Sequence, residues 1–292
     1  MFGSIIRSIE RTFVYLPERA LKGTPAHIGL PYEDVWFRAE DGTRLHGWWI
    51  PAPVGERRGE GETGAADQRR PTAWLFCHGN GGNLSARLDQ LLDIHRRLRA
   101  SVFIFDYRGY GLSEGVPSEE GTYADARAAL GEMSARLGQS HGQTVYFGRS
   151  MGGAIASKLA IERPPSALIL ESPPPSLPEV AHLHVPWSRL WPLRQLMRTR
   201  YETVKHVRRV HAPVLVIQGG QDSAVPERFG RRVFDAANEP KQWLLLPGAG
   251  HNFADLTDPD VYYGAISGFL ARYASSSGGP RLDSSIRNEG GR

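Results

Sequence analysis

The chain has 292 residues, of which 40% are hydrophobic and 23% are charged, and its formal net charge is +4. This length suits one large α/β domain or two small ones. The charge is mild, and the chain shows no zinc-ligand spacing, recognition helix or interleaving of aromatic and basic residues, so the sequence predicts no nucleic-acid partner. The single cysteine, Cys77, excludes an internal disulfide and favours a reducing, cytoplasmic compartment. No apolar run reaches the roughly 18 residues of a membrane span.

The first 24 residues are predicted to form an amphipathic N-terminal segment (1–24). Four apolar residues recur on one face at helical spacing, with charged residues opposite them: Ile5, Ile6, Ile9 and Phe13. One interpretation is a helix packed on the body of the protein. The other is a helix that lies in a membrane surface and gives the protein peripheral membrane contact through residues 1–16.

Residues 25–274 are predicted to form one α/β domain. It begins with a hairpin, residues 34–39 and 44–50, joined by an Asp-Gly turn. The Gly-, Glu- and Arg-rich stretch 54–71 lacks periodicity and is predicted to be a flexible loop. From residue 72 onward, short apolar strands alternate with helices, which predicts a mostly parallel sheet with helices on both faces. These strands are 72–77, 101–106, 144–148, 167–171, 213–218 and 241–246.

Two segments depart from this alternation. Residues 176–211 carry aromatic residues and an excess of arginine, and helical pieces here would form a short cap over the strand ends. The aromatic residues could line an acyl pocket or pack the cap onto the core. Residues 275–292 are rich in Ser and Gly and are predicted to be a disordered tail.

The stretch with the strongest functional signal is 148–152, Gly-Arg-Ser-Met-Gly, because a buried strand precedes it and a small-residue helix follows. In that context the G-x-S-x-G pattern predicts a nucleophile elbow with Ser150 at its tip. Ser140 also lies in a G-x-S-x-G pattern, but it falls between a helix and a strand. We therefore interpret Ser140 as a surface turn residue and Ser150 as the nucleophile.

A nucleophilic serine needs a base, and that base needs an orienting acid. Asp222 follows strand 213–218 and His251 follows strand 241–246, both at carboxyl ends, where the working residues of such sheets gather. The order Ser150, Asp222, His251 is the one expected for an elbow serine hydrolase. Taken singly, Asp222 could be a helix N-cap and His251 a loop residue. Glu171, at the end of strand 167–171, is the alternative acid.

The elbow and the loop after strand 72–77 predict an oxyanion hole. The Met151 N–H lies at the start of the helix, and the Asn80 N–H lies in the glycine-rich stretch 78–83, so we expect these two donors to face the developing oxyanion. A phosphate-cradling loop is the rival interpretation, but no Lys follows it as in a P-loop. His78 is interpreted as structural, and Asp106 and Arg108 as a structural pair in the next strand-end loop.

Together these motifs resemble the α/β-hydrolase superfamily. Residues 78–82 (His-Gly-Asn-Gly-Gly), 106–113, 148–153, 219–222 and 250–252 carry the resemblance, which extends over about residues 32–273. Within that superfamily the chain most resembles small serine hydrolases with a short cap, such as acyl-protein thioesterases and bacterial carboxylesterases. The resemblance implies an α/β-hydrolase fold with a mostly parallel sheet of about eight strands. It also implies hydrolysis of a small-molecule carboxylic ester or thioester without a metal or organic cofactor.

Two other functions stay open at this stage. A serine peptidase of the aminopeptidase type would need acidic cap residues to hold a substrate amine, whereas the predicted cap is basic. A non-catalytic module for membrane or partner binding could use the same fold without an intact triad. If the N-terminal segment serves only as an anchor, removal of residues 1–15 is expected to leave turnover of a soluble ester unchanged.

Overall fold

The computed structural model describes residues 12, 14–53, 73–138, 143–184, 197–252 and 254–274. Several predictions fall outside these residues. They concern most of the N-terminal segment (1–11), the loop 54–71, the turn at Ser140, the middle of the predicted cap (185–196) and the tail 275–292. Within the described part of the chain, no helix is both long and apolar enough to cross a bilayer.

An eight-stranded sheet forms the centre of the molecule, with the strand order β10-β9-β8-β7-β4-β6-β3-β2. The strands from β10 to β6 run parallel, and β3 and β2 add an antiparallel edge. The predicted α/β-hydrolase fold, with its mostly parallel sheet of about eight strands, is therefore confirmed. The bounds are β2 (Glu33–Arg38), β3 (Arg44–Ile50), β4 (Ala73–Cys77), β6 (Ser101–Asp106), β7 (Thr144–Arg149), β8 (Ala167–Glu171), β9 (Val214–Gly219) and β10 (Lys241–Leu246).

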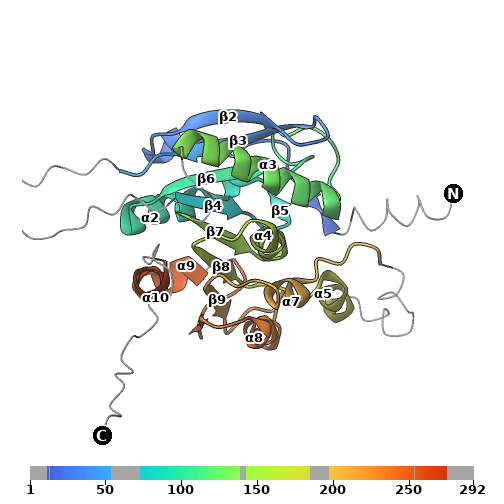
Figure 1. Cartoon of the computed structure of the whole chain (residues 1–292), viewed down its shortest axis with the longest axis vertical. Helices are drawn as coiled ribbons and strands as arrows, with labels where there is room; N and C mark the ends of the chain where they lie inside the picture. The colour runs from blue at the N-terminus through green and yellow to red at the C-terminus, as the bar shows by residue number, and fades with distance from the viewer. Residues whose placement is uncertain are drawn as a thin grey trace, which may run out of the picture.

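Helices cover both faces of this sheet (Figure 1). One face packs against α2 (Leu88–Leu98), α9 (Ala254–Thr257) and α10 (Pro259–Tyr273). The other packs against α3 (Glu119–Leu137), α4 (Met151–Glu162), α5 (Leu177–His184), α7 (Thr203–Val207) and α8 (Glu227–Ala236). Alternate side chains of β4 enter the two layers, since Trp74 and Phe76 join one core and Leu75 and Cys77 the other. Burial on both faces explains why the strands are apolar throughout.

The N-terminal segment contributes a short strand beside the main sheet. β1 (Leu16–Pro17) pairs in parallel with β5 (Gly81–Gly82). Val14 and Tyr15, just before β1, are buried. The sequence pattern did not predict this pairing. The pairing places residues 14–17 against the body of the protein. Two 3₁₀ turns complete the described elements, η1 (Pro25–Ile28) and η2 (Leu84–Arg87).

The end of the predicted cap interval packs into the body. Val207 and Val210 are buried in the core beneath α4. The Tyr201 hydroxyl is buried as well, 3.0 Å from the Tyr15 hydroxyl and 2.8 Å from the Thr122 Oγ1 of α3. The pattern of alternating strands and helices does not predict such packing, because the packing depends on residues far apart in the chain.

Candidate active site

Ser150 lies on a tight turn between β7 and α4. Its φ of 52° and ψ of −121° fall outside the regions that non-glycine residues usually adopt. Glycine at 148 and 152 allows the turn to close. A β-carbon at Gly148 would lie 2.5 Å from the Gly152 carbonyl oxygen, and one at Gly152 would lie 2.0 Å from the Cys77 carbonyl oxygen. This is the geometry of the predicted nucleophile elbow.

His251 and Asp222 form a hydrogen-bonded chain with Ser150. The His251 Nε2 lies 3.1 Å from the Ser150 Oγ, and the His251 Nδ1 lies 2.7 Å from the Asp222 Oδ2. Asp222 follows β9 and His251 follows β10, so parallel strands bring residues from three distant segments to one edge of the sheet. The structure therefore brings together the three residues that the sequence analysis selected.

The Asp222 carboxylate is held in its ionised form. Burial acts to raise its pKa, but the hydrogen bond and the charge of His251 outweigh burial and hold the pKa below its usual value. Its Oδ1 accepts the Val225 N–H at 2.7 Å, and its Oδ2 accepts from the Gln218 Nε2 at 3.2 Å. A buried carboxylate so placed can fix the tautomer of His251 and stabilise an imidazolium.

The two residues predicted to stabilise the oxyanion both lie near Ser150. Met151 is the first residue of α4, and Asn80 lines the same cleft as Ser150. The loop that carries Asn80 comes close to Ser150, because a β-carbon at Gly79 would lie 3.6 Å from the Ser150 Cβ. The position of Met151 at a helix N-terminus also favours negative charge there.

The N-terminal strand holds the Asn80 loop in place. The Leu16 N–H donates to the Asn80 carbonyl oxygen at 3.1 Å, and the Asn80 side-chain amide donates to the Val14 carbonyl oxygen at 3.0 Å. The Tyr110 hydroxyl also donates to the Asn80 carbonyl oxygen, at 2.8 Å. A deletion of residues 1–15 would remove Val14, so the expectation that it leaves ester turnover unchanged no longer follows.

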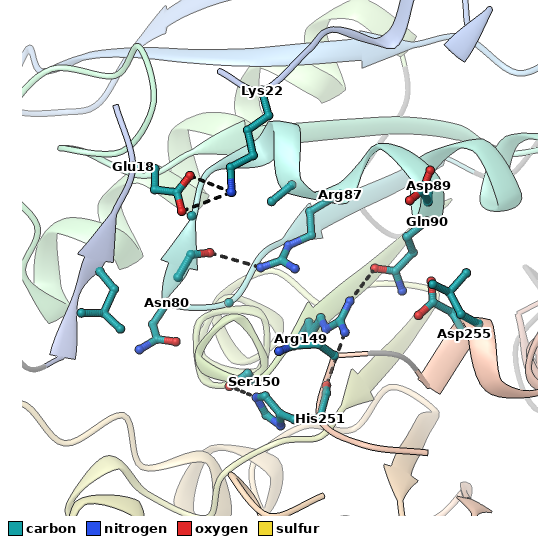
Figure 2. A pocket seen from close by; sticks show the side chains of 17 residues that line it. Glu18, Lys22, Asn80, Arg87, Asp89, Gln90, Arg149, Ser150, His251 and Asp255 are labelled. Atoms are coloured by element: carbon teal, nitrogen blue, oxygen red, sulfur yellow. Dashed lines mark hydrogen bonds and ion pairs between the residues drawn. The ribbon is translucent and has the colours of Figure 1, made fainter. Parts of the chain in front are cut away.

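A cleft of about 630 Å³ opens beside Ser150 and His251. Its walls come from the N-terminal strand, the Asn80 loop, η2, the start of α2 and the loop after β10 (Figure 2). Leu16 and Leu256 contribute exposed apolar side chains, and several charged residues line the remainder. No group of three or more His, Cys, Asp or Glu side chains among the described residues has a metal-binding arrangement.

Two structural roles predicted near the site have different outcomes. His78 is buried, with its Nδ1 2.7 Å from the Gly79 carbonyl oxygen, in agreement with a structural role. The predicted Asp106–Arg108 pair is wrong. Arg108 instead binds Asp125 of α3 and Asp41 of the hairpin turn, and Asp106 accepts the Leu84 N–H. Local spacing carries no information about the distant segments that supply these partners.

Comparisons with known proteins identify the family. The model of a family described as serine aminopeptidase, S33, matches residues 69–192. An uncharacterized protein of Mycobacterium tuberculosis strain H37Rv is 40% identical over 269 residues, which cover 92% of this chain and 90% of that protein. The α/β-hydrolase domain-containing protein WAV2 of Arabidopsis thaliana is 32% identical over 291 residues, which cover 93% of this chain and 90% of that protein. The chain belongs to the α/β-hydrolase superfamily.

A solved structure supports the same fold for this hydrolase. The esterase Pf2001 of Pyrococcus furiosus superimposes with a TM-score of 0.69 at 18% sequence identity, covering 89% of this chain and 98% of that one. At this identity the likeness concerns the fold.

A buried ion pair lies next to the candidate triad of this α/β hydrolase. Arg149 and Glu171 face each other in the register of β7 and β8, with the Arg149 Nε 3.4 Å from the Glu171 Oε1. Glu171 also accepts from the Tyr262 hydroxyl and the Gln90 Nε2. The Arg149 Nη2 donates to the His251 carbonyl oxygen at 3.3 Å, which ties the histidine loop to the sheet.

Glu171, the alternative acid in the sequence analysis, therefore belongs to this network, and the carboxylate that contacts the His251 ring is that of Asp222. Sequence reasoning missed the supporting role of Arg149. The available signal was an arginine at the end of an otherwise apolar strand, where a buried charge needs a partner.

Proposed function

We propose that this α/β hydrolase is a serine hydrolase that cleaves a carboxylic ester or thioester through an acyl-enzyme intermediate. The observation that carries the proposal is the hydrogen-bonded chain from Ser150 through His251 to Asp222. The strained elbow supports it, because such backbone strain is characteristic of functional sites.

The proposed reaction has two halves. The His251 Nε2 takes the Ser150 proton as the Oγ attacks the substrate carbonyl carbon, and the N–H groups of Met151 and Asn80 stabilise the oxyanion that forms. His251 then gives the proton to the departing alcohol or thiol. In the second half His251 takes a proton from water, the resulting hydroxide attacks the acyl-enzyme, and Ser150 recovers its proton as the acid leaves.

A fluorophosphonate probe tests whether Ser150 is activated. We expect one adduct by intact mass on the wild-type protein and on Ser140→Ala, and none on Ser150→Ala. Hydrolysis of a short-chain ester should follow the same pattern. If a folded wild-type protein forms no adduct, the catalytic proposal fails and a non-catalytic binding role takes its place.

The description of the matched family favours a second candidate, an aminopeptidase. A peptidase of that type must hold the substrate's ammonium group, and three carboxylate residues line the cleft: Glu18, Asp89 and Asp255. Glu18 is already paired with Lys22, so the ester reaction is the preferred proposal. Release of p-nitroaniline from aminoacyl p-nitroanilides, faster than hydrolysis of matched esters, would favour the peptidase.

A further inference from the structure

Arg87 places a positive charge near Ser150, and both side chains border Gly79. It ends η2, and its side chain lines the cleft and donates from Nη2 to the Gly81 carbonyl oxygen at 3.2 Å. A β-carbon at Gly79 would lie 3.9 Å from that Nη2 and 3.6 Å from the Ser150 Cβ. In Figure 2 the Arg87 side chain points toward the loop that carries Asn80, and Ser150 lies across the cleft.

The charge of Arg87 is only partly balanced by its surroundings, because the charges of Glu171 and Asp255 act to raise its pKa. Among the described residues, no carboxylate forms an ion pair with it, and its Nε is buried without a hydrogen-bond partner. Burial and the neighbouring charge of Arg149 lower the pKa of Arg87 to about 10, so it stays protonated at neutral pH. A partly buried cation of this kind gains stability when an anion binds.

Arg149 provides the contrast within the same cleft. Its guanidinium faces Glu171, Gln90 and the His251 carbonyl oxygen, so its charge is paired even though its Nε, like that of Arg87, is buried without a hydrogen bond. Arg149 is therefore a supporting residue. Among the described residues Arg87 makes one hydrogen bond, to Gly81, and keeps donors available on its planar guanidinium, whose geometry suits a carboxylate or a phosphate.

The carboxylates that line the cleft do not take the place of such an anion. Glu18 pairs with Lys22 at 2.9 Å. Burial and the charge of Glu171 raise the pKa of Asp255, which disfavours its charged form. The third, Asp89, is exposed to solvent.

We propose that Arg87 binds an anionic group, a carboxylate or a phosphate, that the substrate carries a few bonds from its scissile carbonyl. The proposal rests on the proposed function, because the subsite is placed relative to the carbonyl carbon that Ser150 attacks. Arg87 then acts as a specificity-determining residue that selects acidic esters over neutral esters of the same size.

Matched pairs of esters test this selection. Monobutyl succinate and butyl pentanoate differ by a carboxylate on the acyl side, and 1-butyrylglycerol 3-phosphate and 1-butyrylglycerol differ by a phosphate on the alcohol side. For at least one pair, we expect kcat/KM of the wild type to be tenfold or more higher for the anionic ester. The pair with the larger ratio identifies the anion. Arg87→Gln should lower that ratio at least tenfold.

Arg96→Gln is the matched control, since Arg96 is exposed on the next helix, α2, and does not line the cleft; it should leave the ratio unchanged. If Arg87→Gln folds poorly, Arg87→Lys should keep part of the ratio because it keeps the charge. A wild-type ratio near one for both pairs, or a ratio unaffected in Arg87→Gln, would overturn the proposal. If the wild type forms no fluorophosphonate adduct and hydrolyses none of these esters, the serine hydrolase function itself is contradicted.

Discussion

The substitution Asp222→Asn probes how the candidate triad is oriented. In the wild type the carboxylate faces three donors: the His251 Nδ1, the Val225 N–H and the Gln218 Nε2. Asparagine keeps the size of the side chain but offers one acceptor oxygen and one donating amide. It therefore cannot satisfy His251 and Val225 at the same time.

Either orientation of the asparagine costs activity. With its oxygen on the Val225 N–H, its amide faces the His251 Nδ1, so the ring proton moves to Nε2 and the ring cannot accept the Ser150 proton. The reverse orientation places two buried donors together, at about 1–3 kcal/mol, and it also lacks the charge-assisted bond to the imidazolium, worth about 1.5–3 kcal/mol. Together these effects correspond to a loss in kcat of about 10²- to 10⁴-fold.

The assay is kcat for hydrolysis of a neutral short-chain ester, with thermal unfolding to verify the fold. Glu171→Gln is the comparison, because Glu171 is also buried near the site but bonds to Tyr262 and Gln90. We expect it to lower stability while kcat falls less than tenfold. If Asp222→Asn stays within tenfold of the wild type and Glu171→Gln loses more, Glu171 is the orienting acid and the reasoning is wrong.

Two further predictions concern the strand that supports the site and the response to acid. Asn80→Ala keeps the N–H assigned to the oxyanion but removes the amide that donates to the Val14 carbonyl oxygen. A loss of about 0.5–1.5 kcal/mol in loop anchoring should lower kcat severalfold with KM little changed; an unaltered kcat would separate the strand from catalysis. Burial lowers the pKa of His206 to about 4, whereas the unfolded side chain titrates near 6.5. The stability from neutral His206 is therefore full above about pH 6.5 and declines toward pH 4. In urea unfolding, His206→Gln should lose less stability than the wild type between pH 7.5 and 5, and equal losses would assign the acid sensitivity to other groups.

The elbow and the order of the candidate triad could be predicted because each leaves a local trace. Gly148 and Gly152 are required by backbone contacts that a β-carbon would violate, so the glycines appear in the sequence. Asp222 and His251 each follow a strand, and parallel strands bring their carboxyl ends to one edge. These arguments need no knowledge of which side chains meet across the fold.

The partners of Arg108 and the pairing of β1 with β5 could not be predicted in this way. Arg108 binds Asp125 and Asp41, which lie 17 and 67 residues away in the chain. β1 is only two residues long and has no period to detect. Contacts of this kind depend on where distant segments come to lie, so the Asp106–Arg108 prediction, which relied on nearness in sequence, was wrong.

The two arginines at the site differ in role, and the register of the sheet explains the difference. Because Arg149 lies opposite Glu171 across β7 and β8, its burial is compensated by a charge that the fold itself supplies. Arg87 is the last residue of a 3₁₀ turn rather than part of a strand, and in the described part of the chain no carboxylate forms an ion pair with it. A partly buried cation without an ion-pair partner does not stabilise the fold, so the position of Arg87 beside Ser150 needs another explanation. An anionic substrate group supplies that explanation, and the same logic ranks Arg87 above Arg149 as the residue to mutate for specificity.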